Sequence, residues 1–274
     1  MFILVSTNDI TIAVKKIVNQ VVISMKKNWY AEWFNEDYAR IYHYRDAKEA
    51  ANFIEELIKR LNHSINYRIL DIGCGTGRHV QHLLSKYEHV IGVDLSMTLL
   101  SMRSSKSLPV LRADMRRLPF RPNSFDLILN LFTAFGYFED DEEHYKCILN
   151  WSDLLSPEGI MIIDYLNSEK VIDEVKQGIN LVSKVDAGEY QVFTTKDVIQ
   201  IDNLNYINKK IKITDKGSES RLFVEKVRLF TQEDFRRMLA NAGLEIVGFY
   251  GDYSFSEFTA ESPRLIIKAK KNAN

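Results

Sequence analysis

The sequence predicts a doubly wound α/β domain that carries a small antiparallel β insertion. Between residues 67 and 165, short apolar segments alternate with segments of helical periodicity, a pattern typical of a parallel sheet with helices on both faces. A glycine-rich turn follows the first apolar segment. Between residues 192 and 230 the apolar period falls to about two, as in antiparallel strands with one solvated face.

The core strands are expected where short apolar runs end in turn or helix signals. These runs lie at 67–72, 89–93, 110–114, 125–131 and 160–165. Apolar residues spaced three and four apart predict a helix after the first strand and another between about 140 and 155. Ser96 is the expected cap of a short helix after the second strand. These elements form a predicted core unit at 67–165.

The segment before this core has a different composition and a different predicted structure. Residues 25–66 are rich in aromatic side chains and predict a helical cover, in which Asp46 begins a helix with a capping box. Met25-Lys26-Lys27 looks like a start of translation. Residues 1–24 are therefore interpreted either as an upstream extension or as a genuine appendage.

The C-terminal side is expected to hold the insertion and the end of the main sheet. Residues 166–230 form the predicted insertion, with about three strands from residue 192 onward, which we expect to act as a lid. In residues 231–274, Thr231 is the expected cap of a helix that stops at Gly243. Two last strands are expected at 244–250 and 264–269.

Composition and charge narrow the function. The chain has 274 residues, 46% hydrophobic and 27% charged, which suits one α/β domain with an insertion. A net charge of −1 gives no bulk attraction to nucleic acid or anionic lipid. Two cysteines exclude a disulfide framework and a four-thiolate zinc site, so we expect a cytoplasmic protein. No apolar run approaches the roughly 18–20 residues of a membrane span, and no metal site is expected.

The turn after the first strand reads Asp71-Ile72-Gly73-Cys74-Gly75-Thr76-Gly77. Glycines there let the backbone approach a ligand, and the following helix offers unsatisfied N–H groups. The spacing differs from the Gly-x-Gly-x-x-Gly fingerprint of dinucleotide sites. Asp71 would repel a pyrophosphate but suits a ligand with an ammonium and a sulfonium. S-adenosylmethionine carries both charges and no phosphate; the alternative for Asp71 is a turn-capping carboxylate.

Two further acids follow the next strands. Asp94 ends the second strand, where it could accept hydrogen bonds from both hydroxyls of a ribose, although a NAD site would use the same acid. Asp114 follows the third strand and could accept from the exocyclic amine of adenine while Met115 packs on the ring. Met115 could equally be a core residue. The carboxyl ends of parallel strands share one edge, where ligands bind.

Together these motifs resemble the class I S-adenosylmethionine-dependent methyltransferases, over residues 67–165 and more weakly on both sides. The resemblance rests on the glycine turn and on Val93-Asp94, Ala113-Asp114-Met115, Phe125-Asp126-Leu127-Ile128 and Ser156-Pro157-Glu158-Gly159. It implies a Rossmann-like, seven-stranded sheet whose last strand is antiparallel, and S-adenosylmethionine as cofactor. The cofactor-binding residues expected from the motifs and from the aromatic cover are Asp71, Gly73, Gly75, Gly77, Asp94, Leu95, Asp114, Met115, Asn130, Leu131, Tyr30, Tyr38 and Arg45.

The acceptor of such an enzyme is less constrained. The fourth strand runs into Asn130-Leu131-Phe132-Thr133 and lacks the Asn-Pro-Pro-Tyr tetrapeptide typical of enzymes that methylate nucleobase amines. We therefore expect in-line methyl transfer to a nitrogen or oxygen of a small molecule, by a monomer or homodimer. The candidate acceptor-side groups are His43, Tyr137, Tyr165 and Glu257, and Arg264 is expected to be structural. Open alternatives are an RNA or protein methyltransferase, a non-catalytic binding protein and, disfavoured by the glycine spacing, an NAD-dependent oxidoreductase.

Overall fold

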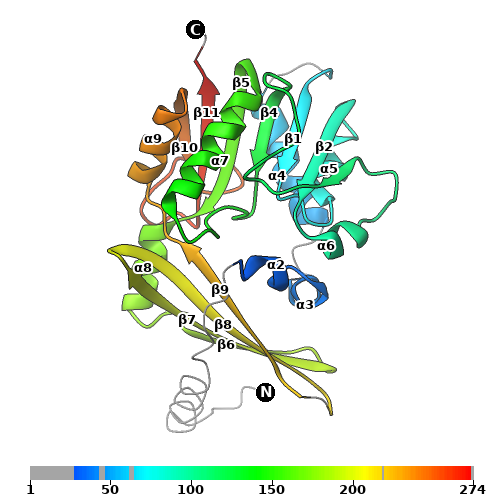
Figure 1. Ribbon diagram of the computed structural model, residues 1–274. Helices are drawn as coiled ribbons and strands as arrows, with labels where there is room; N and C mark the ends of the chain where they lie inside the picture. Colours follow the sequence, from blue (N-terminus) through cyan, green and yellow to red (C-terminus); the bar gives the residue numbers. More distant parts are fainter. Residues whose placement is uncertain (1–27, 43–46, 62–64, 218, 273–274) are drawn as a thin grey trace.

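The computed structural model describes residues 28–42, 47–61, 65–217 and 219–272. Their main sheet has seven strands in the order β10-β11-β5-β4-β1-β2-β3 (Figure 1). The strands are β1 (Arg68–Ile72), β2 (His89–Asp94), β3 (Val110–Arg112), β4 (Phe125–Asn130), β5 (Leu155–Leu166), β10 (Leu244–Tyr250) and β11 (Arg264–Lys271). Strands β1 to β5 are parallel, and β11 is antiparallel to both of its neighbours. The predicted seven-stranded sheet with an antiparallel last strand is confirmed.

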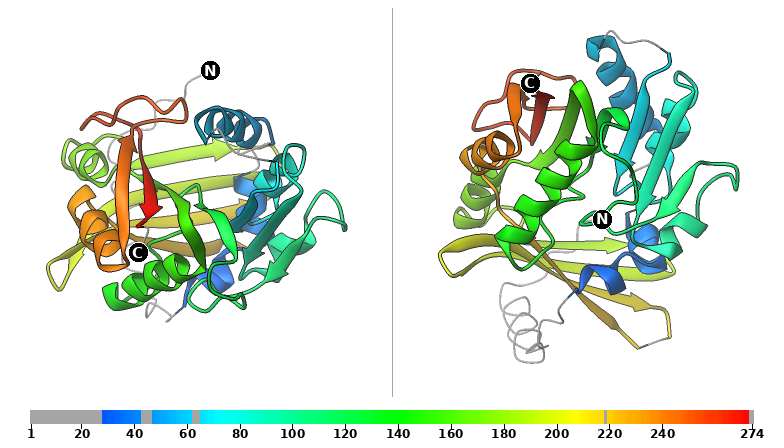
Figure 2. Two further views of the ribbon diagram at one scale, coloured as in Figure 1. Left: turned by 90° about the horizontal axis from the view of Figure 1, so that it is seen from above. Right: turned by 45° about the horizontal axis from the view of Figure 1, so that its top comes forward.

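Helices cover both faces of this sheet (Figure 2). They are α4 (Ala47–Leu61), α5 (Arg78–Leu83), α6 (Met97–Ser101), α7 (Asp141–Leu154) and α9 (Gln232–Asn241). Neighbouring residues of β4 face opposite sides: Ile128 packs with α7 and α9, whereas Leu127 and Leu129 pack with α4 and α5. A strand buried on both faces needs a continuous apolar run, which explains why the core strands were recognisable in the sequence.

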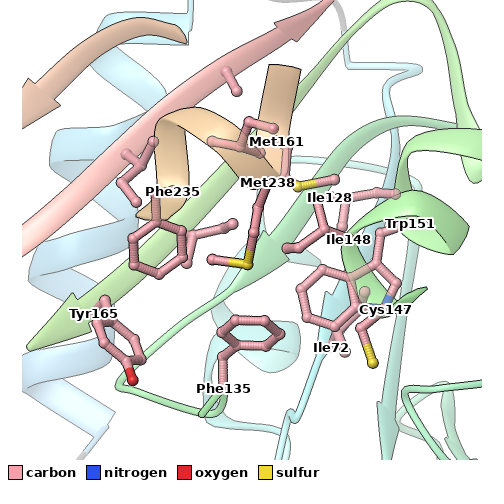
Figure 3. Close-up of a cluster of buried hydrophobic side chains, with 14 of the residues drawn as sticks. Ile72, Ile128, Phe135, Cys147, Ile148, Trp151, Met161, Tyr165, Phe235 and Met238 are labelled. Atoms are coloured by element: carbon pink, nitrogen blue, oxygen red, sulfur yellow. The ribbon is translucent and has the colours of Figure 1, made fainter. Parts of the chain in front are cut away.

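The face of the sheet under α7 and α9 holds most of the buried aromatic residues of the main sheet's core. Trp151 of α7 and Phe235 of α9 lie against Phe135, which follows β4 (Figure 3). All three side chains are fully buried. The helix α9 begins with the predicted cap, because the Thr231 and Asp234 side chains each accept a hydrogen bond from the other's backbone N–H. Among the described helices, none is long and apolar enough to cross a membrane.

The insertion is a separate antiparallel sheet in the order β6-β7-β8-β9. Its strands are β6 (Val182–Asp186), β7 (Tyr190–Ile201), β8 (Leu204–Asp215) and β9 (Arg221–Arg228), and the helix α8 (Ser168–Lys176) precedes them. The expected three strands from about residue 192 correspond to β7, β8 and β9, whereas β6, which lies before that residue, was not predicted. Every residue of β6 is exposed, so it lacks the alternation of apolar and polar residues that identifies a half-buried strand.

The segment that we call the cover, residues 28–42, contains α2 (Tyr30–Trp33) and α3 (Glu36–Ile41) and lies between the two sheets (Figure 1). Trp33 is buried in a cluster with Tyr190, Ile211 and other apolar residues of the insertion. Ion pairs join the same two parts: Arg221 contacts Asp37 at 2.7 Å and also Asp215 of β8. The insertion therefore packs against the side of the cover that faces away from the main sheet. Residues 1–24 and the predicted helix start at Asp46 lie outside the described residues.

Trp33→Ala should lower the free energy of unfolding by about 3–5 kcal/mol, because it empties the centre of a buried cluster that joins the cover to the insertion. Urea denaturation followed by circular dichroism would measure the change. A loss below about 1 kcal/mol, which is ordinary for a point substitution, would show that the cover and the insertion do not stabilise one another.

Candidate active site

At the carboxyl end of β1, the glycine turn lies close to the backbone of β2 and of the turn after β4. Gly73, Gly75 and Gly77 all have positive φ, between 56° and 78°. The N–H of Gly73 donates to the carbonyl of Val93 at 2.8 Å, which ties the turn to β2. A Cβ atom on Gly73 would lie 2.6 Å from the Cβ of Ala134, in the turn after β4, so no side chain fits there. At Gly75 the nearest atom to such a Cβ, on Leu99, is 4.0 Å away.

A cavity of about 450 Å³ opens at this point, at the carboxyl ends of β1, β2 and β4 and over the segment after β3. Its size falls within the range of roughly 300–1,000 Å³ of small-molecule sites. The predicted cofactor-binding residues that line it are Tyr30, Tyr38, Gly73, Gly75, Asp94, Leu95, Asp114, Met115 and Leu131. Asp71, Gly77 and Asn130 are not among its lining residues, and Arg45 lies outside the described residues.

Asp94 is anchored but retains acceptor capacity. Its Oδ2 accepts from the Gly75 N–H and its Oδ1 from the Ser96 N–H, both at 2.8 Å. Burial raises the pKa of this carboxyl, while the N–H groups of Ser96 and Gly75 oppose that shift. Since each carboxylate oxygen has two lone pairs, the group can still accept two hydroxyl hydrogens from a ligand. The Ser96 side chain caps α6, as predicted.

Asp114 is paired within the protein. Its carboxylate receives the Arg116 guanidinium through both oxygens, at 2.6–3.1 Å, and Arg116 also contacts Glu143 at 3.0 Å. Burial acts to raise the pKa of Asp114, but the Arg116 hydrogen bonds outweigh it and the pKa is lowered. Much of the acceptor capacity that we expected to face an adenine amine is therefore used by Arg116. The sequence interpretation missed this arginine, which stands only two residues after Asp114.

Asp71 and His79 form a buried pair behind the glycine turn. Asp71 is 1% exposed, and its Oδ2 lies 3.8 Å from the Nδ1 of His79. Burial, with the nearby charge of Asp94, raises the pKa of Asp71 to about 7. Burial also lowers the pKa of His79 to about 3, so this imidazole is neutral near pH 7. The structure thus places Asp71 under the turn rather than against the cavity.

Aromatic rings from the cover and from the segment after β4 form one wall of the cavity. Tyr137 contacts Phe34 with ring centroids 5.4 Å apart, and Phe34 contacts Tyr38 at 4.8 Å. Tyr38 in turn contacts Tyr42 at 4.8 Å. No described residue of 166–230 lines the cavity, which corrects the expectation that the insertion itself is the lid. The insertion instead packs against the cover, which lines the cavity.

These features fit S-adenosylmethionine. The open space at Gly75 admits a ligand beside the backbone, and Asp94 can accept from a ribose without a phosphate in the site. The aromatic wall suits a cationic sulfonium, because aromatic faces attract cations. Arg78, at the start of α5, also lines the cavity and lies 4.7 Å from the centre of the Phe132 ring. The sequence interpretation overlooked Arg78, although it directly follows the third glycine.

Comparison with known proteins gives the same assignment. Residues 69–159 match the model of a family described as a methyltransferase domain. The protein YqeM of Bacillus subtilis, named as a putative methyltransferase, is 27% identical over 212 residues, which are 75% of this chain and 84% of that protein. The dTDP-3-amino-3,4,6-trideoxy-α-D-glucopyranose N,N-dimethyltransferase of Streptomyces venezuelae is 24% identical over 65% of this chain and 75% of its own length.

The chain is a class I S-adenosylmethionine-dependent methyltransferase. A solved structure of an S-adenosylmethionine-dependent methyltransferase from Clostridium acetobutylicum shares its fold, with a TM-score of 0.70 and 22% identity. That similarity covers 86% of this chain and all of the other. The methyltransferase uses S-adenosylmethionine as its cofactor, as the sequence predicted.

Of the candidate acceptor-side groups of this methyltransferase, the structure places one at the cavity and two away from it. Tyr137 lines the cavity, and its hydroxyl donates to the carbonyl of Thr133. Tyr165 was misplaced by the sequence interpretation: it is fully buried, donates to the carbonyl of Arg228, and has a pKa raised by burial. Glu257 was also misplaced, because it is exposed on the loop before β11 and does not line the cavity. His43 lies outside the described residues.

Gly75→Ala should weaken cofactor binding strongly while leaving the methyltransferase folded. Gly188→Ala is its matched control, since Gly188 also has positive φ (80°) and a Cβ added there would meet no atom within 4 Å. Both substitutions should lower stability by about 1–2 kcal/mol through left-handed backbone strain. Calorimetric titration with S-adenosylhomocysteine should show at least a tenfold weaker affinity for Gly75→Ala alone. Equal affinities in the two variants would contradict a cofactor beside Gly75.

Asp71→Asn should change how stability depends on pH. The folded protein keeps the Asp71 proton up to about pH 7, whereas an unfolded Asp loses it near its ordinary pKa of 3.8. Between these values the folded state binds more protons, so this carboxyl favours folding increasingly as the pH falls. His79 has the opposite effect, because its pKa is lowered on folding, but it is present in both proteins.

Urea denaturation of both proteins at about pH 7.5 and about pH 5 would test this. The wild type should gain free energy of unfolding relative to Asp71→Asn as the pH is lowered. A difference that stays constant with pH would show that Asp71 is not protonated in the folded protein in this range.

Proposed function

We propose that this methyltransferase transfers a methyl group to an amine nitrogen of a small-molecule acceptor. The observation that supports this most strongly is the set of titratable groups on the cavity wall. Asp94 and Asp114 are held by hydrogen bonds within the protein, and burial makes His79 a weak base. Among the described lining residues, none is placed as a strong general base. A hydroxyl acceptor usually requires one, whereas a neutral amine brings its own lone pair.

The roles of the cavity residues follow from their positions. Asp94 would accept from the ribose hydroxyls, and Gly73 and Gly75 would let the cofactor lie on the backbone. When bound, S-adenosylmethionine supplies a methyl group made electrophilic by the attached sulfonium. Phe34, Tyr38 and the other rings of the wall would exclude water and hold the acceptor nitrogen in line with the methyl carbon, which reduces the entropic part of the barrier.

The size of the cavity also favours a small acceptor. A cavity of about 450 Å³ lined on one side by the cover has room for a cofactor and a compact molecule, not for a folded nucleic acid. The Streptomyces venezuelae relative is named as an N,N-dimethyltransferase of an amino sugar nucleotide. Amino sugars and other compact primary or secondary amines are therefore the acceptor class to test first.

The test uses pairs of acceptors that differ in one atom. Each amino sugar nucleotide or small amine is offered with the counterpart that has a hydroxyl at the same carbon, and methylated product is measured by mass spectrometry alongside S-adenosylhomocysteine. We expect methylation of an amine and none of its hydroxyl counterpart. The rate should rise with pH as the acceptor ammonium loses its proton, since only the neutral amine has a free lone pair.

The same assay separates failure of the acceptor assignment from loss of the enzyme. Binding of S-adenosylhomocysteine confirms that the protein used is active in cofactor binding. Equal methylation of the hydroxyl counterparts would overturn the proposal, because it would require a base that the amine reaction does not need. Methylation confined to RNA or protein substrates would overturn the choice of a small acceptor.

A further inference from the structure

Two consecutive residues after β4 have a backbone conformation that is rare for their type. Phe132 has a φ of 55° and Thr133 a φ of 60°. The left-handed region is unfavourable for residues with a Cβ, and for a β-branched residue such as threonine it is a true outlier. Strain of this kind persists only where surrounding contacts enforce it, and it gathers at ligand sites.

Asp164, near the end of β5, supplies the enforcing contacts from both its side chain and its backbone. Its Oδ2 accepts from the Phe132 N–H at 2.7 Å, and its carbonyl accepts from the Thr133 N–H at 3.0 Å. The Tyr253 hydroxyl donates to the same Oδ2 at 3.1 Å. Asp164 is fully buried, so water does not replace these hydrogen bonds, and a displaced Phe132 or Thr133 N–H would lose its acceptor.

Arg264, the first residue of β11, connects this carboxylate to the turn. Its Nε donates to the Asp164 Oδ1 at 2.8 Å, and its Nη2 donates to the Thr133 Oγ1 at 2.7 Å. One planar guanidinium thus holds both the buried acid and the side chain of the strained residue. A lysine could keep the charge pair but has no second, rigidly spaced donor for Thr133.

The strained turn is also part of the cavity wall. Leu131, Phe132 and Ala134 line the cavity. Ala134 lies so close to Gly73 that a Cβ on this glycine would overlap it. The ring of Phe132 lies 5.0 Å, centre to centre, from the ring of His79 in α5. A shift of this turn would therefore displace the glycine turn and the start of α5, which it contacts.

We propose that Asp164 and Arg264 are positioning residues of this methyltransferase: together they hold Phe132 and Thr133 in the left-handed conformation and so fix the wall formed by residues 131–134 against the glycine turn. They act through the turn and do not line the cavity themselves. This inference rests on the cavity being the cofactor site. It does not depend on the identity of the acceptor, because cofactor affinity is its readout.

The experiment compares Arg264→Lys, Thr133→Ala and the double variant with the wild type. Calorimetry with S-adenosylhomocysteine gives the dissociation constant, and thermal unfolding without ligand gives the stability of the same preparations. Each single variant should remain folded and bind about fivefold to tenfold more weakly. The double variant should bind no more weakly than Arg264→Lys alone, because both substitutions break the same contact between Arg264 and Thr133.

Arg68→Lys is the matched control. Arg68 also pairs with an aspartate through two nitrogens, its Nε and Nη2 reaching Asp126 at 2.9 and 2.7 Å, but this pair joins the starts of β1 and β4, at the edge of the sheet opposite the cavity. It should change the thermal midpoint without changing the dissociation constant. When an acceptor is known, the Arg264 and Thr133 variants should also show a lower kcat.

Three outcomes would overturn the proposal. The first is unchanged affinity in folded Thr133→Ala, which decides the matter even if Arg264→Lys does not fold. The second is an equal loss of affinity in Arg68→Lys, which would mean that general softening of the sheet is responsible. The third is an additive effect in the double variant, which would show that Arg264 and Thr133 act independently.

Discussion

The close approach of Gly73 to Ala134 is the constraint on which the rest of the site depends. With 2.6 Å between a hypothetical Cβ on Gly73 and the Cβ of Ala134, the glycine turn and the turn after β4 meet without any side chain between them. Because β1 and β4 are adjacent parallel strands, the contact joins two walls of the cavity at their base. Asp94 accepts a hydrogen bond from the Gly75 N–H, which extends the same rigid frame to β2.

A second, more peripheral set of contacts borders the cavity on the side of the cover. The cover places its aromatic rings on the cavity, and the insertion supports it through Trp33 and the ion pairs of Arg221. The two parts contribute differently. The glycine turn and the residues at the strand ends can hold any ligand that lies against the backbone. The rings of the cover instead limit the space that remains for an acceptor. We therefore expect acceptor choice to depend on the cover and, indirectly, on the insertion behind it.

Much of this could be predicted because it is local in the sequence. The glycine turn, the capped helices and the strands buried on both faces each have a spacing or composition that a single sequence displays. The strand β6 could not be found, since its residues are all exposed. The pairing of Asp114 with Arg116 was missed because a carboxylate near a strand end looks the same whether a ligand or a neighbouring arginine is its partner.

Strand β5 shows why side-chain roles are harder to predict than elements. We expected Tyr165 to be an acceptor-side group, but it is its neighbour Asp164 that bonds to a residue of the cavity wall, through the N–H of Phe132, while Tyr165 bonds to the carbonyl of Arg228 in the core. Successive residues of a strand face opposite sides, so an error of one position exchanges a side chain that supports the cavity wall for one that packs in the core. Arg264 was expected to be structural, but its partner Thr133 lies 131 residues away, a separation that no local pattern reveals.

We expect the frame around Gly73, Gly75 and Asp94 to bind S-adenosylmethionine and not a dinucleotide. Calorimetric titration of the purified protein with S-adenosylmethionine, S-adenosylhomocysteine and NADH, each alone, tests it most directly. The first two should bind in the micromolar range, and NADH should give no heat of binding. Binding of NADH alone would contradict this expectation, because the glycine turn would then be holding a pyrophosphate.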